Sequence, residues 1–297
     1  TNREVNRLIG GTKGSHIIVA PFDGASTTAV YVEAKSDQRP FFIIPWDNKY
    51  LIGTTDIRYD GDLDNLQITD EEIHYLLRET NRIIPTANLN RDKILYSYSG
   101  VRPLPFTDDE DERSITRRHF IRRHSGFGNL LSIVGGKLTT YRSLSEEAVD
   151  LVFKILGRNS PPCITAGTPL PGASSETSNA SNPRASQPVT DRLKRIYGTR
   201  ASEVIKLIEK DESLSSAFDS ETGAIAAEVV YAFTNEFAST LPDCLLRRTM
   251  VGLNSNCGLN AIERAGQIAQ QHLDWSESRV TEELSDYQRY VERFILR

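Results

Sequence analysis

Residues 129–142, NLLSIVGGKLTTYR, decide the fold class of this chain. An apolar run that favours a strand is followed by Gly135 and Gly136, and then by a helical pattern over about 138–156. Glycines at such a junction let backbone amides approach a ligand closely, and a helix start directs free amides and the positive end of its dipole toward the same place. Lys137 adds a full charge, so this corner predicts a binding site for an anion or a carbonyl oxygen. A turn that only packs the helix on the strand is the alternative.

The residues around this segment predict a meandering, mixed or antiparallel sheet. β-branched and aromatic runs alternate with short polar turns. One helix interrupts them, with a capping box formed by Thr69 and Glu72 at its start and Pro85 at its end. An acidic run at 108–112 predicts a loop. The expected strands cover residues 16–22, 28–35, 41–47, 50–57, 94–104, 114–124 and 129–136.

Beyond the second helix the composition changes. Residues 158–189 are rich in Ser, Asn and Pro, with little to bury, and predict a linker. Residues 190–297 carry helical periodicity almost throughout and predict an all-α domain. The predicted class is therefore α+β, with a sheet domain over 1–157 that ends in an α/β segment at about 114–157, followed by the helical C-terminal domain.

Composition excludes several classes of protein. The 297 residues carry a net charge of −5, so the chain lacks the basic excess typical of a nucleic-acid binder. Its three cysteines are widely spaced without a C-x-x-C pair, and no metal-binding motif is present, so we expect no metal and reduced thiols in a cytoplasmic protein. The longest apolar runs are too short to span a bilayer. Because Met250 is the only methionine, we expect a further segment before Thr1.

Two other segments carry residues that suit an anion. The run Gly11–His16 predicts a tight turn with His16 at the start of a strand; a surface histidine is the alternative. Pro103 forces an extended backbone on Arg102 and so fixes the direction of its guanidinium, whose fork matches two oxygens at once. A structural salt bridge of Arg102 is the alternative. The run 53–56, GTTD, is interpreted as turn chemistry rather than pocket lining.

The basic run Thr116–His119 is expected to lie on a strand. Alternate residues of a strand share a face, so Arg117 and His119 would point together and away from Arg118. One arginine can then enter a pocket while the other is solvated. A solvated run of surface charges is the alternative. The sequence has no G-x-G-x-x-G turn, so a dinucleotide-binding fingerprint would have to lie outside it.

Five motifs in this order resemble one family, the FAD-dependent glycerol-3-phosphate dehydrogenases and the related glycerophosphate oxidases. The motifs are KGSH (13–16), PW-x6-GTTD (45–56), YSGVRPL (98–104), ITR (115–117) and GGKLTTYR (135–142). The resemblance continues loosely into LPDCLLRRT (241–249). It implies oxidation of sn-glycerol 3-phosphate to dihydroxyacetone phosphate, with hydride transfer to FAD and electrons passed to a quinone or to oxygen.

The resemblance also assigns roles to residues. His16 would be the base or hydrogen-bond partner at the substrate hydroxyls. Arg102 and Lys137 would contact substrate and the flavin edge, and Arg117 would hold the phosphate. The segment 114–157 would be the returning part of a flavin-binding domain, attached to a substrate-domain sheet. The residues expected to meet the flavin ring are Gly135, Gly136, Lys137, Leu138 and Thr139.

The dinucleotide-binding half of that family is not recognisable in this sequence. We therefore expect a C-terminal portion that by itself lacks FAD and activity. The implied location is cytoplasmic, with peripheral association with the inner face of the membrane left open. Two other functions remain: a non-catalytic ligand-binding or assembly module derived from such an enzyme, and an FAD-dependent amino-acid oxidase relative.

Overall fold

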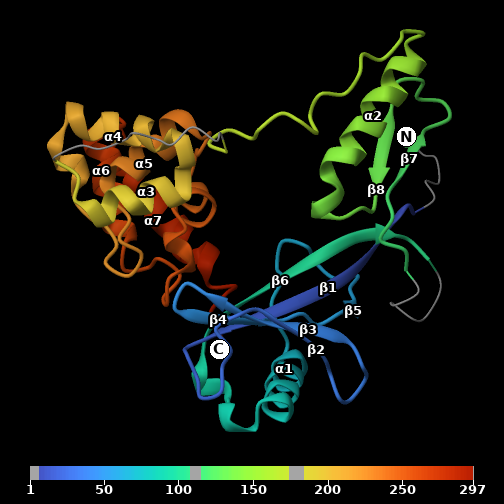
Figure 1. The fold of residues 1–297 in the computed structure, drawn as a ribbon, viewed down its shortest axis with the longest axis horizontal. Coiled ribbons are helices and arrows are strands. Elements are labelled where there is room, and N and C mark those ends of the chain that lie inside the picture. The colour runs from blue at the N-terminus through green and yellow to red at the C-terminus, as the bar shows by residue number, and fades with distance from the viewer. Residues whose placement is uncertain (1–6, 108–114, 174–183, 297) are drawn as a thin grey trace. The chain divides into compact units, whose positions relative to one another are not determined.

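The computed structural model describes residues 7–107, 115–173 and 184–296, and Figure 1 shows their secondary structure. The chain forms two compact units, Thr1–Thr168 and Pro169–Arg297. The predicted acidic loop at 108–112 and the centre of the predicted linker, 174–183, lie outside the described residues. The three predicted domain boundaries stay predictions.

An antiparallel sheet forms the core of the first unit. Its order is β2-β3-β4-β1-β5, and β6 pairs with the other side of β1. β4 and β5 both pair with the same side of β1, so residues 54–56 form a break in that side of the sheet. The strands are β1 (Ile9–Val19), β2 (Val30–Glu33), β3 (Pro40–Trp46), β4 (Lys49–Gly53), β5 (Ile57–Arg58) and β6 (Ile94–Pro105).

The prediction of a turn at Gly11–His16 is wrong. These residues lie inside β1, and each pairs with a residue of β6, from Gly11 opposite Pro103 to His16 opposite Tyr98. The long ladder to β6 supplies hydrogen bonds along the whole segment and overrides the local tendency of glycine to turn. Gly11 and Gly14 instead allow close packing, because a Cβ atom on either would collide with Tyr59 or with Arg102.

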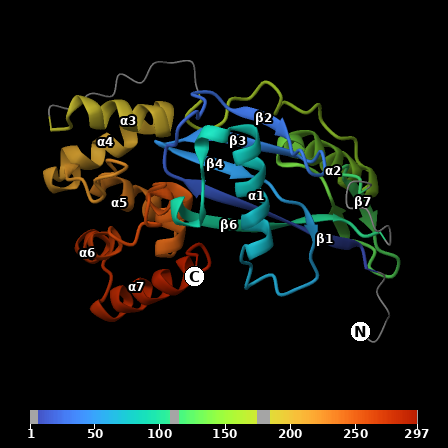
Figure 2. The ribbon, with the colours of Figure 1, turned by 90° about the horizontal axis from the view of Figure 1, so that it is seen from below.

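Helix α1 (Asp70–Ile83) lies against one face of this sheet (Figures 1 and 2). The predicted capping box is confirmed, because the backbone N–H of Thr69 donates to Glu72 and that of Glu72 donates to the Thr69 hydroxyl. Ile73 and Leu76 are buried toward the sheet, beside the apolar core. The same face buries the carboxylate of Glu72, which the capping pattern alone did not predict.

A hairpin and a helix complete the first unit. β7 (Phe120–Arg123) pairs with β8 (Leu131–Val134), and a 3-10 turn (Leu138–Thr140) leads into α2 (Tyr141–Ile155). This confirms the predicted strand, Gly-Gly and helix. The strand expected at 114–124 begins only at Phe120, opposite Val134. Gly135 has a φ of 76° and turns the chain away, so no partner remains for residues 115–119.

The second unit is helical, as predicted. A buried ion pair between Arg192 and Glu228 joins two of its helices, and the Tyr197 hydroxyl also donates to Glu228 at 3.2 Å. Its helices are α3 (Gln187–Tyr197), α4 (Ala201–Lys210), α5 (Ala226–Asn235), a π-helical segment (Asp243–Arg248), α6 (Ile262–His272) and α7 (Glu277–Val291), with 3-10 turns at Gly198–Arg200, Glu212–Ser215 and Val251–Leu253. Two further 3-10 turns, Pro85–Ala87 and Arg91–Lys93, belong to the first unit.

Membrane-spanning helices and clusters of metal ligands are both absent from the described residues. No helix among them has the length and apolar character to cross a membrane. No group of three His, Cys, Asp or Glu side chains in the same residues is placed to hold a metal ion. The cysteines are unpaired thiols, exposed at Cys163 and buried at Cys244 and Cys257.

Candidate anion-binding site

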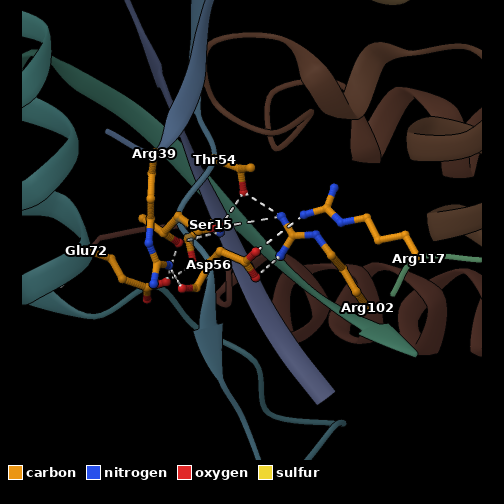
Figure 3. A network of polar contacts seen from close by, with 8 residues as sticks. Ser15, Arg39, Thr54, Asp56, Glu72, Arg102 and Arg117 are labelled. Atoms are coloured by element: carbon orange, nitrogen blue, oxygen red, sulfur yellow. Dashed lines mark hydrogen bonds and ion pairs between the residues drawn. The ribbon is translucent and has the colours of Figure 1, made fainter. Parts of the chain in front are cut away.

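Arg102 reaches across strand β1 to the break between β4 and β5. Its backbone on β6 pairs with Thr12, but its guanidinium donates from Nη1 to Asp56 Oδ1 at 2.9 Å and from Nη2 to Thr54 Oγ1 at 3.1 Å (Figure 3). The crossing point is Gly14, where a Cβ atom would overlap the guanidinium and the Thr54 hydroxyl. The glycine in β1 therefore makes the path that Arg102 follows.

A second arginine meets the same carboxylate. Arg117 Nη2 lies 3.4 Å from Asp56 Oδ2, so the two oxygens of Asp56 serve two guanidinium groups. The side chain of Arg102 is 24% exposed and that of Arg117 is 50% exposed. Burial and the neighbouring Arg117 lower the pKa of Arg102, while Asp56 opposes that shift. Two cations and one anion thus share the site, with a surplus of positive charge.

The site borders a cavity of about 520 Å³. That volume suits a small ligand. Tyr31 and Phe42 form an edge-to-face pair on one wall, with ring centroids 5.3 Å apart. Polar groups of Arg39, Thr54, Asp56 and Arg117 line the rest together with Gln38, Pro40 and Ile115.

His16 lies on β1, two residues after Gly14, the glycine against which the Arg102 guanidinium lies. Its ring stacks on Tyr98, with centroids 4.8 Å apart, and it approaches Gly53 so closely that a side chain there would collide with it. Nδ1 is buried and has no hydrogen-bond partner among the described residues. Burial, aided by the charge of Arg102, lowers the pKa of His16 to about 4. The imidazole is therefore neutral at neutral pH and has a free lone pair.

A buried polar cluster holds the break in place from the α1 side. Glu72 pairs with Lys13 at 2.8 Å and accepts the hydroxyls of Ser15 and Thr55 at 2.7 and 2.6 Å. The Lys13 and Glu72 side chains are 3% and 4% exposed. Burial acts to raise the pKa of Glu72, but the bonds from Lys13 and from the hydroxyls outweigh it, so the pKa is lowered. The Ser15 amide also donates to the Thr55 hydroxyl at 2.9 Å.

The Gly-Gly corner lies beside the end of β6. A Cβ atom on Gly135 would lie 2.9 Å from the carbonyl oxygen of Arg118 and 3.3 Å from the ring of Pro105. Gly135 and Gly136 have φ angles of 76° and 96°, in the left-handed region that favours glycine. The Thr140 hydroxyl donates to the carbonyl of Lys137 at 3.0 Å and closes the turn. Leu138 is 88% exposed, so the start of the helix is open.

The structure brings some of the predicted residues together and leaves others apart. Arg102 and Arg117 meet at Asp56, and His16 lies on β1 two residues after Gly14, which the Arg102 guanidinium crosses. Lys137 is exposed at the Gly-Gly corner. The strand-face explanation for Arg117 is wrong, because residues 115–119 lie outside β7.

Asp56 and Gly14 are the residues that the sequence did not assign. Both lie in motifs that were recognised, GTTD and KGSH, but the first was interpreted as a turn and the second for its histidine. A carboxylate directly after two hydroxyl residues at a strand end is the signal that could have identified Asp56. Nothing local in the sequence connects Gly14 with Arg102, because that contact depends on the pairing of β1 with β6.

Comparison with known proteins places this site in context. Residues 2–142 match the family described as FAD dependent oxidoreductase, and residues 163–280 match the C-terminal domain of alpha-glycerophosphate oxidase. A glycerol-3-phosphate dehydrogenase of Synechocystis sp. is 45% identical over 298 residues, which are 97% of this chain and 54% of that protein. The aerobic glycerol-3-phosphate dehydrogenase of Escherichia coli is 32% identical over 281 residues, 91% of this chain and 54% of that protein.

Two further similarities extend this context. A D-erythritol 1-phosphate dehydrogenase of Brucella abortus is 34% identical over 262 residues, 82% of this chain and 50% of that protein. The solved glycerol-3-phosphate dehydrogenase from Bacillus halodurans, complexed with FAD, has a TM-score of 0.77 and 27% identity, and the match covers 96% of this chain and 57% of that one. The chain thus spans about half the length of the curated relatives it matches.

Proposed function

Since the chain belongs to the family of FAD-dependent glycerol-3-phosphate dehydrogenases, we propose that it forms the substrate side of an enzyme that oxidises sn-glycerol 3-phosphate to dihydroxyacetone phosphate. The observation that carries the proposal is the pair of arginines, Arg102 and Arg117, that meet at Asp56. Asp56 and Arg117 line a small cavity, and the charge of Arg102 acts on the neutral His16. The activity is proposed for the whole polypeptide to which these residues belong.

The arginines would bind the phosphate group. Guanidinium groups bind phosphate oxygens through strong, charge-assisted and often bidentate hydrogen bonds. Asp56 accepts one N–H from each arginine. The Thr54 hydroxyl and the carbonyl of Thr55 accept from Nη2 of Arg102. The other N–H groups of the two guanidiniums have no partner among the described residues, so they are available to the phosphate.

His16 would act on the hydroxyl at C2 of the substrate. A ring nitrogen of the neutral imidazole accepts the hydroxyl proton as C2 loses its hydride. Burial keeps the ring unprotonated at neutral pH, and the stacked Tyr98 fixes its plane. The adjacent Arg102 stabilises negative charge that develops on the oxygen. Lys137, on the corner after β8, is the third residue that we propose in contact with the substrate.

The Gly-Gly corner fits a flavin ring. Two consecutive left-handed glycines and an open helix start expose the backbone at 135–139, where amides of Leu138 and Thr139 suit carbonyl oxygens of the ring. Gly135, Gly136 and Lys137 complete this contact. Bound FAD supplies the acceptor for the hydride. A side chain at Gly135 would collide with the carbonyl of Arg118, so the bare backbone here is a requirement of the fold.

Residues outside this sequence would bind the rest of FAD. Pyrophosphate is usually bound by a G-x-G-x-x-G turn at a helix start, and the sequence contains none. An exposed apolar stripe on α2 supports further structure at this place. Tyr141, Val149, Val152 and Leu156 are 51%, 50%, 41% and 59% exposed, at spacings that put them on one helical face.

The electron acceptor and the location are proposed from the family resemblance alone. The acceptor would be a membrane quinone or oxygen, and the protein would be cytoplasmic with peripheral contact to the inner face of the membrane. Oxygen consumption against reduction of a soluble quinone analogue separates the two acceptors.

The substrate class is tested by reduction of bound flavin. Under anaerobic conditions, glycerol 3-phosphate should bleach the flavin absorbance of the full polypeptide, and glycerol should not. Erythritol 1-phosphate and D-alanine serve as comparators for a longer polyol phosphate and for an amino-acid oxidase. Bleaching by D-alanine, or by none of the four compounds, would reject the proposal.

A further inference from the structure

We propose that Asp56 is a positioning residue, which holds Arg102 and Arg117 at one spacing so that together they bind a phosphate group. This inference rests on the proposed function for the identity of the ligand, but its test uses inorganic phosphate. Asp56 would thus promote the binding of an anion although it is itself an anion next to the binding groups.

The contacts of Asp56 divide between its side chain and its backbone. Oδ1 accepts from Arg102 at 2.9 Å and Oδ2 accepts from Arg117 at 3.4 Å. Its backbone carbonyl accepts from Arg39, and the preceding Thr55 is bonded to Ser15 and Glu72 (Figure 3). The carboxylate therefore belongs to a firmly held segment, and it bridges two arginines that lie 46 and 61 residues further along the sequence.

The two arginines depend on this bridge to different degrees. Arg102 has further acceptors, the hydroxyl of Thr54 and the carbonyl of Thr55, and its side chain is mostly buried. Arg117 lies within the non-strand segment 115–119, its side chain is half exposed, and Asp56 is the acceptor that the structure gives it. Without the carboxylate charge the two guanidiniums repel each other, and Arg117 is the one free to move into solvent.

Asp56 has two opposite effects on the affinity for phosphate, and the change in affinity on its substitution shows which is larger. As a like charge, Asp56 disfavours a nearby phosphate, and its neutralisation should then tighten binding. As a bridge, it spares the phosphate the cost of bringing two mutually repelling side chains together. We expect the bridge to dominate, because Arg117 has so little else to hold it.

Binding of inorganic phosphate to the flavin-loaded protein, measured by calorimetry, tests this inference. Asp56→Asn should weaken phosphate binding about ten-fold, the scale of one charge-assisted hydrogen bond. Asp62→Asn is the matched control: it removes the same charge from an exposed loop, where the carboxylate accepts the backbone amide of Asp64. The KM for glycerol 3-phosphate should rise in parallel in Asp56→Asn, with kcat changed far less.

Two further variants separate positioning from a general structural role. Asp56→Glu keeps the charge and should retain most of the affinity. If Asp56→Asn does not fold, Asp56→Ser removes the same charge and is measured in its place. Once Arg117→Gln has removed the second guanidinium, Asp56→Asn should no longer weaken binding. Unchanged or tighter phosphate binding in Asp56→Asn, or full additivity with Arg117→Gln, would overturn the inference. A protein that binds phosphate with this pattern but does not oxidise glycerol 3-phosphate would instead overturn the proposed function alone.

Discussion

The guanidinium of Arg102 occupies the space that a side chain at Gly14 would fill. Gly14 pairs with Gly100 on β6, two residues before Arg102, so the strand that carries the arginine and the strand that it crosses are direct neighbours. This relationship connects β6 with the break at 54–56 on the far side of β1. The position of the Arg102 guanidinium thus depends on the lack of a side chain at Gly14 in β1.

Gly14→Ala should therefore displace Arg102 from Asp56. We expect phosphate affinity to fall roughly ten-fold or more, since Arg102 loses its place beside Arg117, and stability to fall by about 1–3 kcal/mol from overpacking. Calorimetry and urea unfolding measure the two effects. Gly100→Ala is the control, because a Cβ atom at the cross-strand partner meets nothing within 4 Å. Equal effects of the two substitutions would refute the crossing geometry.

The second prediction concerns the buried pair beneath the site. Glu72→Gln leaves Lys13 charged and buried without its counter-ion, and it should cost about 3–5 kcal/mol of unfolding free energy. Glu71→Gln, next in sequence but on the exposed face of α1, should leave the urea midpoint unchanged. A small effect of Glu72→Gln would mean that the carbonyl of Gln67, which accepts from Lys13 at 2.9 Å, suffices to hold the lysine.

Local patterns in the sequence predicted the elements that local chemistry governs. The capping box of α1 and the strand, Gly-Gly and helix at 129–155 are confirmed because each depends on neighbours within a few residues. The turn predicted at Gly11–His16 is wrong because its conformation depends on pairing with residues about 90 positions away. The strand predicted at 114–124 is too long for a related reason: the conformation of Gly135 ends its ladder.

The candidate site divides in the same way. Arg102 could be predicted as an anion-binding residue from local features, its charge and the constraint that Pro103 places on its backbone. Arg117 could be predicted from the basic run around it. Their common acceptor, Asp56, could not be selected, since it depends on three separate segments meeting at a break in a sheet. The catalytic and binding roles of the site residues stay predictions, which substitutions at these residues test.

The third prediction uses two adjacent arginines. Arg117→Ala should raise the KM for glycerol 3-phosphate about ten- to a hundred-fold, because one charge-assisted contact to the phosphate is lost. Arg118→Ala should change KM little, since its position contributes a backbone carbonyl beside Gly135. Steady-state kinetics on both variants give the comparison. Losses of similar size would place both arginines at the phosphate, or neither.

The last prediction is a pH dependence of stability that originates at His16. Burial and Arg102 lower its pKa from 6.5 to about 4 in the folded protein. Above pH 6.5 the ring is neutral in both the folded and the unfolded state, so no stability is lost. As the pH falls below 6.5, the unfolded chain binds a proton that the folded chain does not, which favours unfolding. The loss stops near pH 4, where the folded ring also becomes protonated.

At pH 4.5 the unfolding free energy should be lower than at pH 7 by roughly 2 kcal/mol on account of this residue, within the limit set by the shift of its pKa. His16→Gln removes the titration, so the difference between the two proteins isolates His16 from carboxylates that titrate in the same range. Urea unfolding at several pH values between 4 and 7.5 measures both curves. If the curves run parallel over this range, the imidazole is not held neutral by burial and Arg102, and its proposed role as a proton acceptor at neutral pH loses its physical basis.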